Sequence, residues 1–432
     1  MSINSDPTVL QNATPAQLEW AVALNHRELF CLTALAANGE VQELDGVTWT
    51  NGGATADSML TFFSLAEERA GQQIDAIVAY YLQHNSSMVG CWSLDPPRPA
   101  DLGIQLLARG FQPGWRPCWM ALDLHTLQPN HPTPTGLKVI ADNAISLHDV
   151  KDLPYANVGG AGVYSTLVQR YPGRLQRFVA MLDNKVVAHS ALLFTTGAYG
   201  VAGIYNVGVV PTARKQGIGR AVTLAACLYA QARGYHYAGL NATEMGRGMY
   251  AQLGFQWLGD GWTWWLNVPR VRAQPPTKAQ IVLAEAVGWG DLATLEQVGA
   301  QFSTADLQTP MANQMTLLQL AIDAGQPAAA TWLVAHGVAL TVLAAWDLGW
   351  HDHAAQLLAA QSEQINQRYG EWAMTLLHVA AQRNDVPLAR LALCANPDLT
   401  IQDATFHSTP LGWAKYFQRA EIVQLIEKYQ AG

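Results

Sequence analysis

The spacing of apolar and polar positions changes several times across the middle of the chain. The segment "LKVIAD" from residue 137 alternates, which predicts a strand, whereas "ISLHDVKDL" and "VYSTLVQRY" repeat at helical spacing. Residues 176–210 alternate again, in three blocks. Asn184, which tolerates positive φ, and the segment Gly197–Gly200 supply the turns between the blocks. Three antiparallel strands are therefore expected here.

The region continues with a second alternation of helices and strands. A helical pattern runs through "GRAVTLAACLYAQARG" and is followed by a strand, "YHYAGLNA". A second helix is expected over "EMGRGMYAQLGF", and "QWLGDGWTWWLNV", residues 256–268, is expected to form a final hairpin.

Two motifs in this order carry a family resemblance. Arg214-x-x-Gly217-x-Gly219 stands directly after a strand ending in "VGVVP" and resembles the acyl-CoA-binding motif of the GNAT acetyltransferase superfamily. "MYAQLGF", from Met249, resembles the second motif of that family, a helix with a tyrosine that leads into Leu-Gly-Phe. The resemblance covers residues 137–268. It implies an α+β GNAT fold, in which helices flank a mixed central sheet.

The first motif suits a diphosphate for physical reasons. A helix N-terminus leaves unpaired N–H groups and a partial positive charge, and glycines let the backbone approach a bulky anion. The alternative is a glycine-softened turn with surface charges. By resemblance, the cofactor is acetyl-CoA, and its pantetheine arm pairs with the preceding strand, where the Val209 N–H polarises the thioester carbonyl. The residues expected to bind the cofactor are Val207, Gly208, Val209, Arg214, Lys215, Gln216, Gly217, Ile218, Gly219, Arg220, Asn241 and Thr243.

The second motif supplies a proton donor. Coenzyme A leaves as a thiolate, and by resemblance Tyr250 is the general acid that protonates it; the alternative is that its ring only packs on the helix. The sequence departs from the family where many members carry Asn, because Thr243 stands there. The central strand also lacks a carboxylate base, so His189 and Glu244 are the nearest titratable candidates.

The acceptor pocket is expected between the helices at 145–171 and the hairpin after Phe255. Aromatic residues at strand spacing are more often part of a core, so core packing is the alternative for each residue considered for the lining. These residues are Tyr155, Tyr164, Tyr199, Tyr205, Trp262 and Trp264.

The first third of the chain resembles a second, degenerate lobe of the same kind. Gly110-Phe111-Gln112 matches Gly254-Phe255-Gln256, and a helix, strands, a helix and a strand precede it in similar order. The glycine motif is replaced by "EERAGQQIDA", and Leu106 stands in place of the acid tyrosine. Residues 1–128 are therefore expected to be a degenerate GNAT-like lobe that binds no acyl-CoA.

The last third repeats itself. "TLLQLAIDAG", "TLLHVAAQRN" and "TPLGWAKYFQ" share a form, and two weaker copies fit the same register. The repeat resembles ankyrin, which predicts about five stacked helix pairs over residues 278–430. Such stacks bind protein partners or brace a neighbouring domain. His351 and His353 are two residues apart on a helix and point in different directions, so no metal site is expected.

Charge separates the three regions. Residues 137–277 carry 13 Lys and Arg against 6 Asp and Glu, whereas the whole chain has a net charge of −8. A basic middle suits an anionic ligand, and no nucleic-acid motif accompanies it. The five cysteines have no disulfide or metal spacing. No signal peptide or membrane span is expected, so the chain is interpreted as a cytoplasmic protein.

The leading hypothesis is an acetyl-CoA-dependent N-acetyltransferase that acts on a primary amine by direct transfer in a ternary complex. A small-molecule acceptor is favoured. The alternatives are a protein N-acetyltransferase whose ankyrin stack docks the target, and a non-catalytic acyl-CoA-binding or interaction protein.

Overall fold

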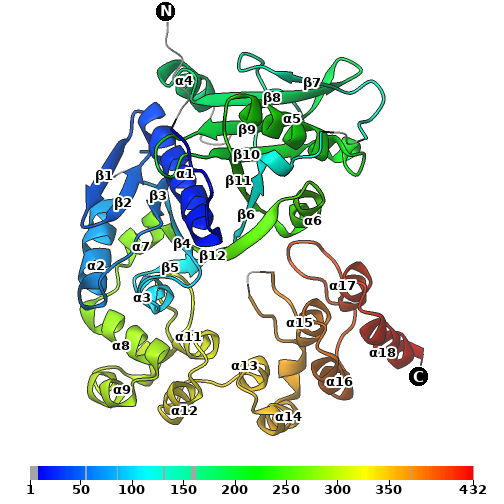
Figure 1. Ribbon diagram of the computed structural model, residues 1–432. Helices are drawn as coiled ribbons and strands as arrows, with labels where there is room; N and C mark the ends of the chain where they lie inside the picture. The colour runs from blue at the N-terminus through cyan, green and yellow to red at the C-terminus, as the bar shows by residue number, and fades with distance from the viewer. Residues whose placement is uncertain are drawn as a thin grey trace, which may run out of the picture. The chain divides into compact units, whose positions relative to one another are not determined.

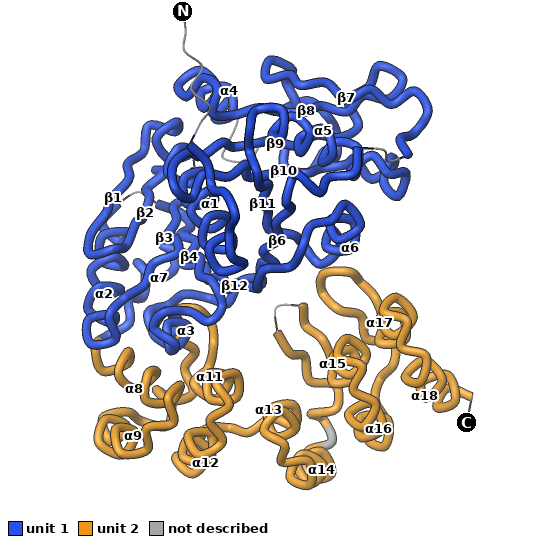
Figure 2. Tube along the Cα trace, viewed as in Figure 1, with its two compact units in different colours: residues 1–277 blue, residues 278–432 orange. Residues whose placement is uncertain are grey.

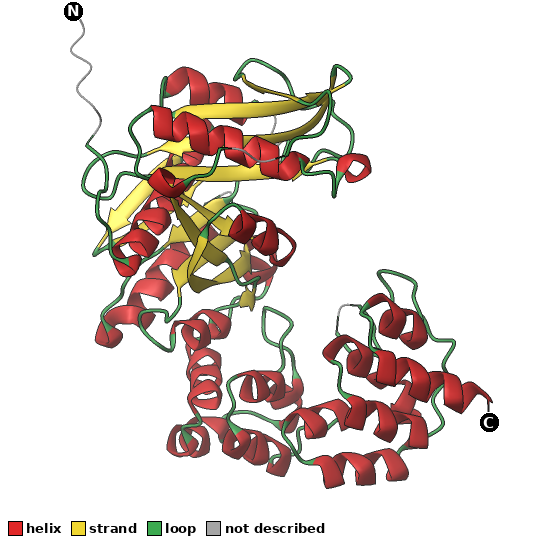
Figure 3. Ribbon diagram, turned by 45° about the vertical axis from the view of Figure 1, so that its right-hand side comes forward, coloured by secondary structure: helices red, strands yellow, loops and turns green. Residues whose placement is uncertain are grey.

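The computed structural model describes residues 8–53, 56–84, 86–129, 132–156, 162–370 and 372–431. The chain divides into two compact units, residues 1–277 and residues 278–432 (Figure 2). Strands belong to the first unit, and helices make up the regular structure of the second (Figure 3). Residues 1–7, where no signal peptide is expected, lie outside the described residues, as do residues 130 and 131.

The first half of unit 1 is a long helix followed by a small α/β segment. Its elements, in chain order (Figure 1), are α1 (Pro15–Ala36), β1 (Glu40–Leu44), β2 (Val47–Asn51), β3 (Ser58–Thr61), α2 (Glu67–Gln83), β4 (Met88–Leu94), α3 (Leu102–Ala108), β5 (Phe111–Pro113), β6 (Cys118–Asp123) and η1 (Leu124–Thr126). Helix α1 begins with a capping box in which the Thr14 side chain accepts from the Gln17 N–H, and Pro15 stands at the first helical position.

The second half contains the three expected antiparallel strands and the two expected helices that follow them. Its elements are β7 (Lys138–Ala141), α4 (Val163–Arg170), β8 (Leu175–Leu182), β9 (Lys185–Phe194), β10 (Ala202–Val209), η2 (Pro211–Ala213), α5 (Ile218–Ala232), β11 (Tyr237–Ala242), α6 (Glu244–Gln252), β12 (Gln256–Asn267) and α7 (Val268–Ala273). The β8–β9 turn places Asp183 and Asn184 at positive φ, which this short turn requires.

The two halves exchange strands within one sheet. The strand order is β1-β2-β3-β4-β12-β6-β11-β10-β9-β8-β7, so β6 from the first half lies between β11 and β12 of the second. Strand β12 pairs with β6 through Gln256–Asp260 and then with β4 through Gly261–Asn267. Each half thus completes the sheet of the other.

The halves also share a connection pattern. In both, two antiparallel steps lead to a strand, a crossover helix and a parallel strand: β3–α2–β4 in the first half and β10–α5–β11 in the second. Gly110 and Gly254, which match in the sequence, have φ values of +97° and +98° at the end of a short helix. Phe111 and Phe255, which follow them, are both buried.

Helix α1 packs on the sheet at a seam of two paired glycines. A Cβ on Gly203 of β10 would lie 1.9 Å from Asn25 Oδ1, and one on Gly239 of β11 would lie 2.2 Å from Val22 Cγ2. Gly203 and Gly239 are register partners in the β10–β11 pair. These two positions require glycine because the helix approaches the strands so closely.

Two sequence predictions in unit 1 are wrong. No hairpin follows Phe255, because β12 is one continuous strand of 12 residues. Its glycines serve close packing rather than a turn: a Cβ on Gly259 would meet Glu19 Oε1 at 2.2 Å, and one on Gly261 would meet Ser93 O at 2.7 Å. Residues 145–153 form turns rather than a helix, and Asp142 Oδ1 accepts there from the N–H groups of Ala144 and Ile145.

Unit 2 is helical. Its elements are α8 (Lys278–Trp289), α9 (Leu292–Gly299), α10 (Thr304–Gln308), α11 (Leu317–Asp323), α12 (Pro327–Ala335), α13 (Val342–Asp347), α14 (His351–Ala360), η3 (Ser362–Asn366), α15 (Leu376–Arg383), α16 (Val386–Cys394), α17 (Pro410–Tyr416) and α18 (Ala420–Ala431). Apart from α10, these α-helices come in consecutive pairs that contact each other: α8–α9, α11–α12, α13–α14, α15–α16 and α17–α18. Each of the three sequence repeats has an alanine five residues after its first Thr, and the two weaker copies have an alanine in the same register. All five are buried, namely Ala286, Ala321, Ala345, Ala380 and Ala414.

Hydrogen bonds connect successive helix pairs of unit 2. The Trp332 indole N–H donates to Glu296 at 2.8 Å, and the Trp346 indole N–H donates to Asp385 at 2.8 Å. The buried His378 caps its own helix with Thr375 and lies 3.0 Å from the Ser408 carbonyl through Nε2. Each of these contacts joins a helix pair to the next pair along the chain.

Asp403 holds together the loop before α17. Its carboxylate is buried and accepts from the N–H groups of Thr405, Phe406 and Ser408 and from the indole of Trp413. Burial acts to raise the pKa of Asp403, but these hydrogen bonds lower it below the ordinary 3.8. The charged carboxylate is therefore the form that the fold favours.

We expect Asp403→Ala to lower the free energy of unfolding of residues 278–432 by roughly 2–3 kcal/mol, because buried donors lose their acceptor. The pKa of Asp403 is lower in the folded chain than in the unfolded chain. The contribution of its carboxylate to stability is therefore present above about pH 4 and is lost as pH falls. Urea denaturation at pH 7 and pH 3 measures both effects. The matched control is Asp398→Ala, because Asp398 is exposed and caps only Thr400. Equal destabilisation by the two substitutions would contradict the prediction.

Candidate active site

The parallel strands β10 and β11 separate shortly after they meet. They pair only at Ala202–Ala238 and at Gly203–Gly239. Beyond Gly203, strand β10 is irregular between Tyr205 and Gly208, and Asn206 has a φ of +55°. This bulge bends β10 away from β11, which leaves backbone groups of β10 facing a gap.

Val209 presents its backbone to this gap. The Val210 N–H donates to the Val187 carbonyl of β9 at 2.9 Å, and N–H directions alternate along a strand. The N–H and C=O of Val209 therefore point away from β9, toward the side where β11 has diverged. The Arg214 Nε–H donates to the Val209 carbonyl at 3.2 Å, which agrees with this direction.

The N-terminus of α5 lies next to this strand. Gly217 is the N-cap residue with a φ of +80°, and the nearest atom to a Cβ built on it would be Pro132 O, at 3.9 Å. A Cβ on Gly219 would lie 3.2 Å from Met249 Sδ of α6 and 3.5 Å from Val209 Cγ2. The glycine loop, β10 and α6 thus meet at one place.

Basic and polar groups surround this helix end. Arg214, Lys215 and Gln216 are exposed, whereas Ile218 is buried in the core. Arg220 donates to the Gln252 side chain at 2.7 Å, but its buried Nε–H has no hydrogen-bond partner within the described residues. A buried unpaired guanidinium donor at a helix N-terminus fits an anionic ligand.

Tyr250 lies on α6, in the core cluster that α5 also joins. Its side chain is buried, and its ring centroid is 5.8 Å from that of Phe255. Burial raises the pKa of the Tyr250 hydroxyl, with smaller contributions from Tyr155 and Cys227. The hydroxyl is therefore protonated at neutral pH, as a proton donor must be.

The side chains expected after β11 have other neighbours. The Asn241 amide donates to Nδ1 of His26, on α1, at 2.9 Å. Burial lowers the pKa of His26 to about 3, so the ring is neutral. Thr243 is the N-cap residue of α6, but its side chain makes no capping hydrogen bond.

The two candidate bases are not placed alike. His189 is buried, its Nε2–H donates to the Pro154 carbonyl at 2.7 Å, and burial lowers its pKa. This interaction fastens the loop before α4 to β9 beside Gly208, where a Cβ would lie 3.1 Å from His189 Nε2. Glu244 is exposed at the first turn of α6.

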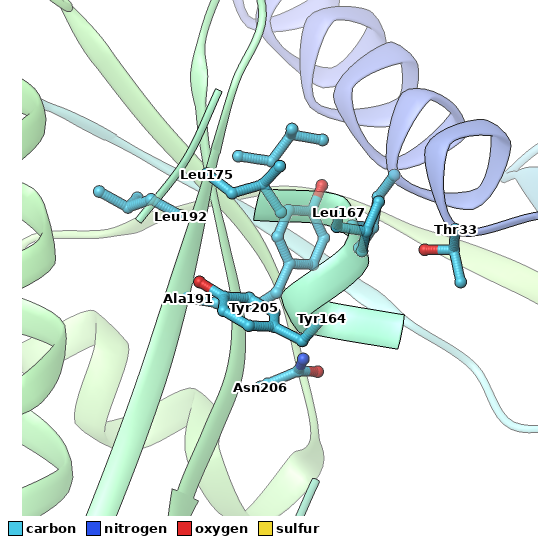
Figure 4. Close-up of a pocket in the computed structure, with 10 residues that line it drawn as sticks. Thr33, Tyr164, Leu167, Leu175, Ala191, Leu192, Tyr205 and Asn206 are labelled. Carbon is cyan, nitrogen blue, oxygen red and sulfur yellow. The ribbon is translucent and has the colours of Figure 1, made fainter. Parts of the chain in front are cut away.

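A cavity of about 40 Å³ lies on the opposite face of the sheet from α5, next to the bulge (Figure 4). The residues that line it are Leu29, Thr33, Tyr164, Leu167, Leu175, Ala191, Leu192, Leu193, Tyr205 and Asn206. Two of the six expected aromatic residues, Tyr164 and Tyr205, are among them.

The other four aromatic residues lie elsewhere. Tyr155 and Tyr199 are largely exposed. Trp262 and Trp264 stack on each other along β12. Sequence reasoning missed the contribution of α1 to the cavity, because no local pattern links Leu29 and Thr33 to strands more than 140 residues away.

A comparison with family models matches residues 151–255 to the acetyltransferase (GNAT) family. This segment is a GNAT acetyltransferase domain. It contains the strand β10, the glycine loop and Tyr250, on which the two sequence motifs lie. GNAT acetyltransferases use acetyl-CoA and an acceptor substrate, so general acyltransferase chemistry follows from the family.

The solved structures that match this chain include several GNAT proteins. A GCN5-related N-acetyltransferase from Kribbella flavida is 14% identical, with a TM-score of 0.44 over 56% of this chain and 94% of its own. A tandem GNAT protein from the clavulanic acid biosynthesis pathway is 14% identical, with a TM-score of 0.41 over 61% and 97%. A GCN5-related N-acetyltransferase from Sphaerobacter thermophilus is 14% identical, with a TM-score of 0.39 over 60% and 97%. No curated protein matches the chain.

Two kinds of feature are absent from the part of the chain that the structure describes. No three His, Cys, Asp or Glu side chains gather in a way that could hold a metal ion in that part of the chain. No helix among the same residues is long and apolar enough to cross a membrane.

Proposed function

We propose that residues 137–268 transfer an acetyl group from acetyl-CoA to a primary amine of a small molecule, by direct transfer in a ternary complex. The observation that carries the proposal is the gap between β10 and β11, where the Val209 backbone and the α5 N-terminus lie beside Met249, the residue before Tyr250. When bound, acetyl-CoA supplies the activated acetyl thioester.

Different groups of the chain are assigned to binding the cofactor, polarising the thioester and donating the proton. The N–H groups of Gly217, Ile218 and Gly219, together with the Arg220 side chain, hold the diphosphate against the positive end of α5. Strand β10 orients the pantetheine arm through Val207–Val209, and the outward Val209 N–H donates to the thioester oxygen as negative charge develops there. Tyr250 donates its phenolic proton to the departing sulfur.

Deprotonation of the acceptor needs no dedicated carboxylate in this scheme. An amine that arrives neutral attacks directly and loses its surplus proton through water. His189 keeps a structural role, because its Nε2–H is engaged by the Pro154 carbonyl.

Tyr250→Phe tests the proton-donor role. We expect kcat to fall roughly 100-fold or more, because general acid catalysis contributes on that scale. The dissociation constant for acetyl-CoA should stay within about twofold, since the ring and its packing on Phe255 remain. Steady-state kinetics and calorimetry measure the two quantities. An unchanged kcat would assign Tyr250 to packing alone.

The pH profile offers a second check on Tyr250. Because burial raises its pKa, the hydroxyl stays protonated through the range where an ordinary tyrosine, near pH 10, begins to ionise. The wild-type kcat should therefore not fall between pH 8 and pH 9.5. A descending limb in that range, absent in Tyr250→Phe, would contradict the assignment.

Residues 1–128 are proposed to be a degenerate GNAT-like lobe. The shared connection pattern and the matching Gly110 and Gly254 support this. In this half the parallel strands do not separate as β10 and β11 do. Strand β3 pairs with β4 from Ser58 to Thr61, and the Phe62 N–H then donates to the Trp92 carbonyl at 2.8 Å. Without a gap between these strands there is no place for a pantetheine arm.

Residues 278–430 are proposed to be a stack of about five ankyrin repeats. The Thr375–His378 capping box and the hydrogen bonds between successive helix pairs support this. Ankyrin stacks dock proteins, so a protein acceptor is the second candidate function. Acetylation of an intact protein that is lost on deletion of residues 278–432 would favour it over a small-molecule acceptor.

The third candidate is a non-catalytic acyl-CoA-binding protein. The lack of a carboxylate on the strand β10 favours this interpretation, and the protonated Tyr250 favours an enzyme. The Tyr250→Phe experiment separates the two, because a sensor has no kcat to lose and its acetyl-CoA affinity would not change.

A further inference from the structure

We propose that the cavity between α1, α4 and strands β8–β10 binds the apolar tail of the acceptor, and that the acceptor is a primary monoamine with a short aliphatic tail. The proposal rests on the acetyltransferase function proposed above. It adds the chemical class of the acceptor and assigns part of its recognition to helix α1, which lies outside the segment that matches the GNAT family.

The cavity wall is apolar. Six of the lining residues are Leu or Ala, and a carboxylate is not among the lining residues. A second ammonium group would therefore lose its hydration in this cavity without gaining a partner, which is costly. Diamines and polyamines fit this wall poorly, whereas a hydrocarbon tail gains from leaving water.

The two tyrosines of the wall act as apolar faces. The Tyr205 hydroxyl donates to Asn25 Oδ1 at 2.6 Å, and the Asn25 amide in turn donates to the carbonyls of Leu193 and Val201. The Tyr164 hydroxyl donates to Asn143 Oδ1 at 3.0 Å. Both hydroxyls are thus engaged by other residues, and what remains for a ligand is the ring.

Asn206 is a polar residue of the cavity lining, and it stands in the part of β10 beside the gap. It occupies the bulge of β10, and its side chain has no hydrogen-bond partner among the described residues. An amide is a neutral acceptor, so it can orient an amine without holding it in the charged form. A tail in the cavity therefore places the amine at the bulge, where the acetyl group is expected.

The cavity volume limits the tail. An engineered protein cavity of about 150 Å³ takes a benzene molecule, so a volume of about 40 Å³ suits a smaller group of a few carbon atoms. Arylalkyl amines should therefore be poorer acceptors than short alkylamines.

Helix α1 closes the outer wall. Gly203 and Gly239 allow it to pack directly on β10 and β11, and one and two turns further along it carries Leu29 and Thr33 to the cavity. The identity of the residue at position 29 should therefore change which acceptors are used, although it belongs to the half of unit 1 that lacks the glycine motif.

The test is an acceptor series with the full-length protein. Release of free coenzyme A from acetyl-CoA is measured with n-alkylamines from ethylamine to hexylamine, with phenethylamine, and with putrescine and spermidine. We expect the highest kcat/KM with tails of about three to five carbons. For the aryl and polyamine acceptors, we expect kcat/KM to be at least roughly tenfold lower than this. A preference for polyamines would overturn the proposal.

Two cavity variants give a readout that a structural defect would not mimic. Ala191→Leu reduces the volume and should move the best acceptor to a shorter tail, whereas Leu29→Ala enlarges it and should move the best acceptor to a longer one. The control is Leu228→Ala, because Leu228 is an exposed leucine of α5, and it should leave the order unchanged.

Calorimetry with acetyl-CoA on the same variants separates the two levels of inference. Acetylation with no shift in tail preference overturns the cavity assignment and leaves the acetyltransferase function standing. Binding of acetyl-CoA with no turnover of any amine overturns both the acceptor class and the small-molecule function. Absence of acetyl-CoA binding in the wild type overturns the acetyltransferase function itself.

Discussion

Gly219→Glu should abolish acetyl-CoA binding without unfolding the protein. The residue stands in the first turn of α5, between Val209 and Met249, where a longer side chain enters the space proposed for the diphosphate. The added carboxylate also repels the phosphates at the point where their charge should be compensated. We expect affinity to fall at least roughly 100-fold, or about 2.8 kcal/mol.

The fold should survive this change, because a carboxylate near a helix N-terminus is favoured by the helix dipole. Gly219→Ala is the matched control: its Cβ would meet Met249 Sδ at 3.2 Å, and a thioether is flexible enough to move. Calorimetry measures both affinities, and thermal denaturation checks both folds. Equal binding by the Ala and Glu variants would show that the glycines serve only the turn.

The second large effect concerns the two halves of unit 1. We expect residues 132–277, expressed without residues 1–128, not to fold into a native lobe. Strand β11 would lose six register partners on β6, and β12 would lose seven on β4. The unpaired strands would expose edges and the apolar seam where α1 packs, which promotes aggregation.

Near-ultraviolet circular dichroism and size-exclusion chromatography test this expectation. Co-expression of residues 1–128 with residues 132–277 is the control, and it should restore a soluble 1:1 complex because every strand regains its partner. A cooperative unfolding transition in residues 132–277 alone would contradict the prediction.

Local patterns were sufficient for the elements around the proposed cofactor site. The strands β8, β9 and β10, the glycine turn and the helix that carries Tyr250 were all predicted, because each depends on residues adjacent in the sequence. The roles of the predicted cofactor-binding residues stay predictions, and the structure brings Val209, Gly219 and Met249 together at one place.

Long-range packing explains what the sequence could not reveal. The segment "GDG" at 259–261 resembles a hairpin turn, but its glycines face Glu19 and the strand β4, which come from the other half of the unit. The sequence pattern also does not indicate why Gly203 and Gly239 are glycines, because the reason is the close approach of α1. Composition and periodicity carry no record of which distant element approaches a glycine.

The exchange of strands also has a consequence for synthesis of the protein on the ribosome. Strand β6 is complete at Asp123, but its neighbour β11 begins only at Tyr237 and β12 at Gln256. At about 5–20 residues per second, β6 waits roughly 6–23 s before its first partner is made. During that interval an apolar strand has no partner on either side, so the nascent chain should be a client for chaperones that hold exposed strands.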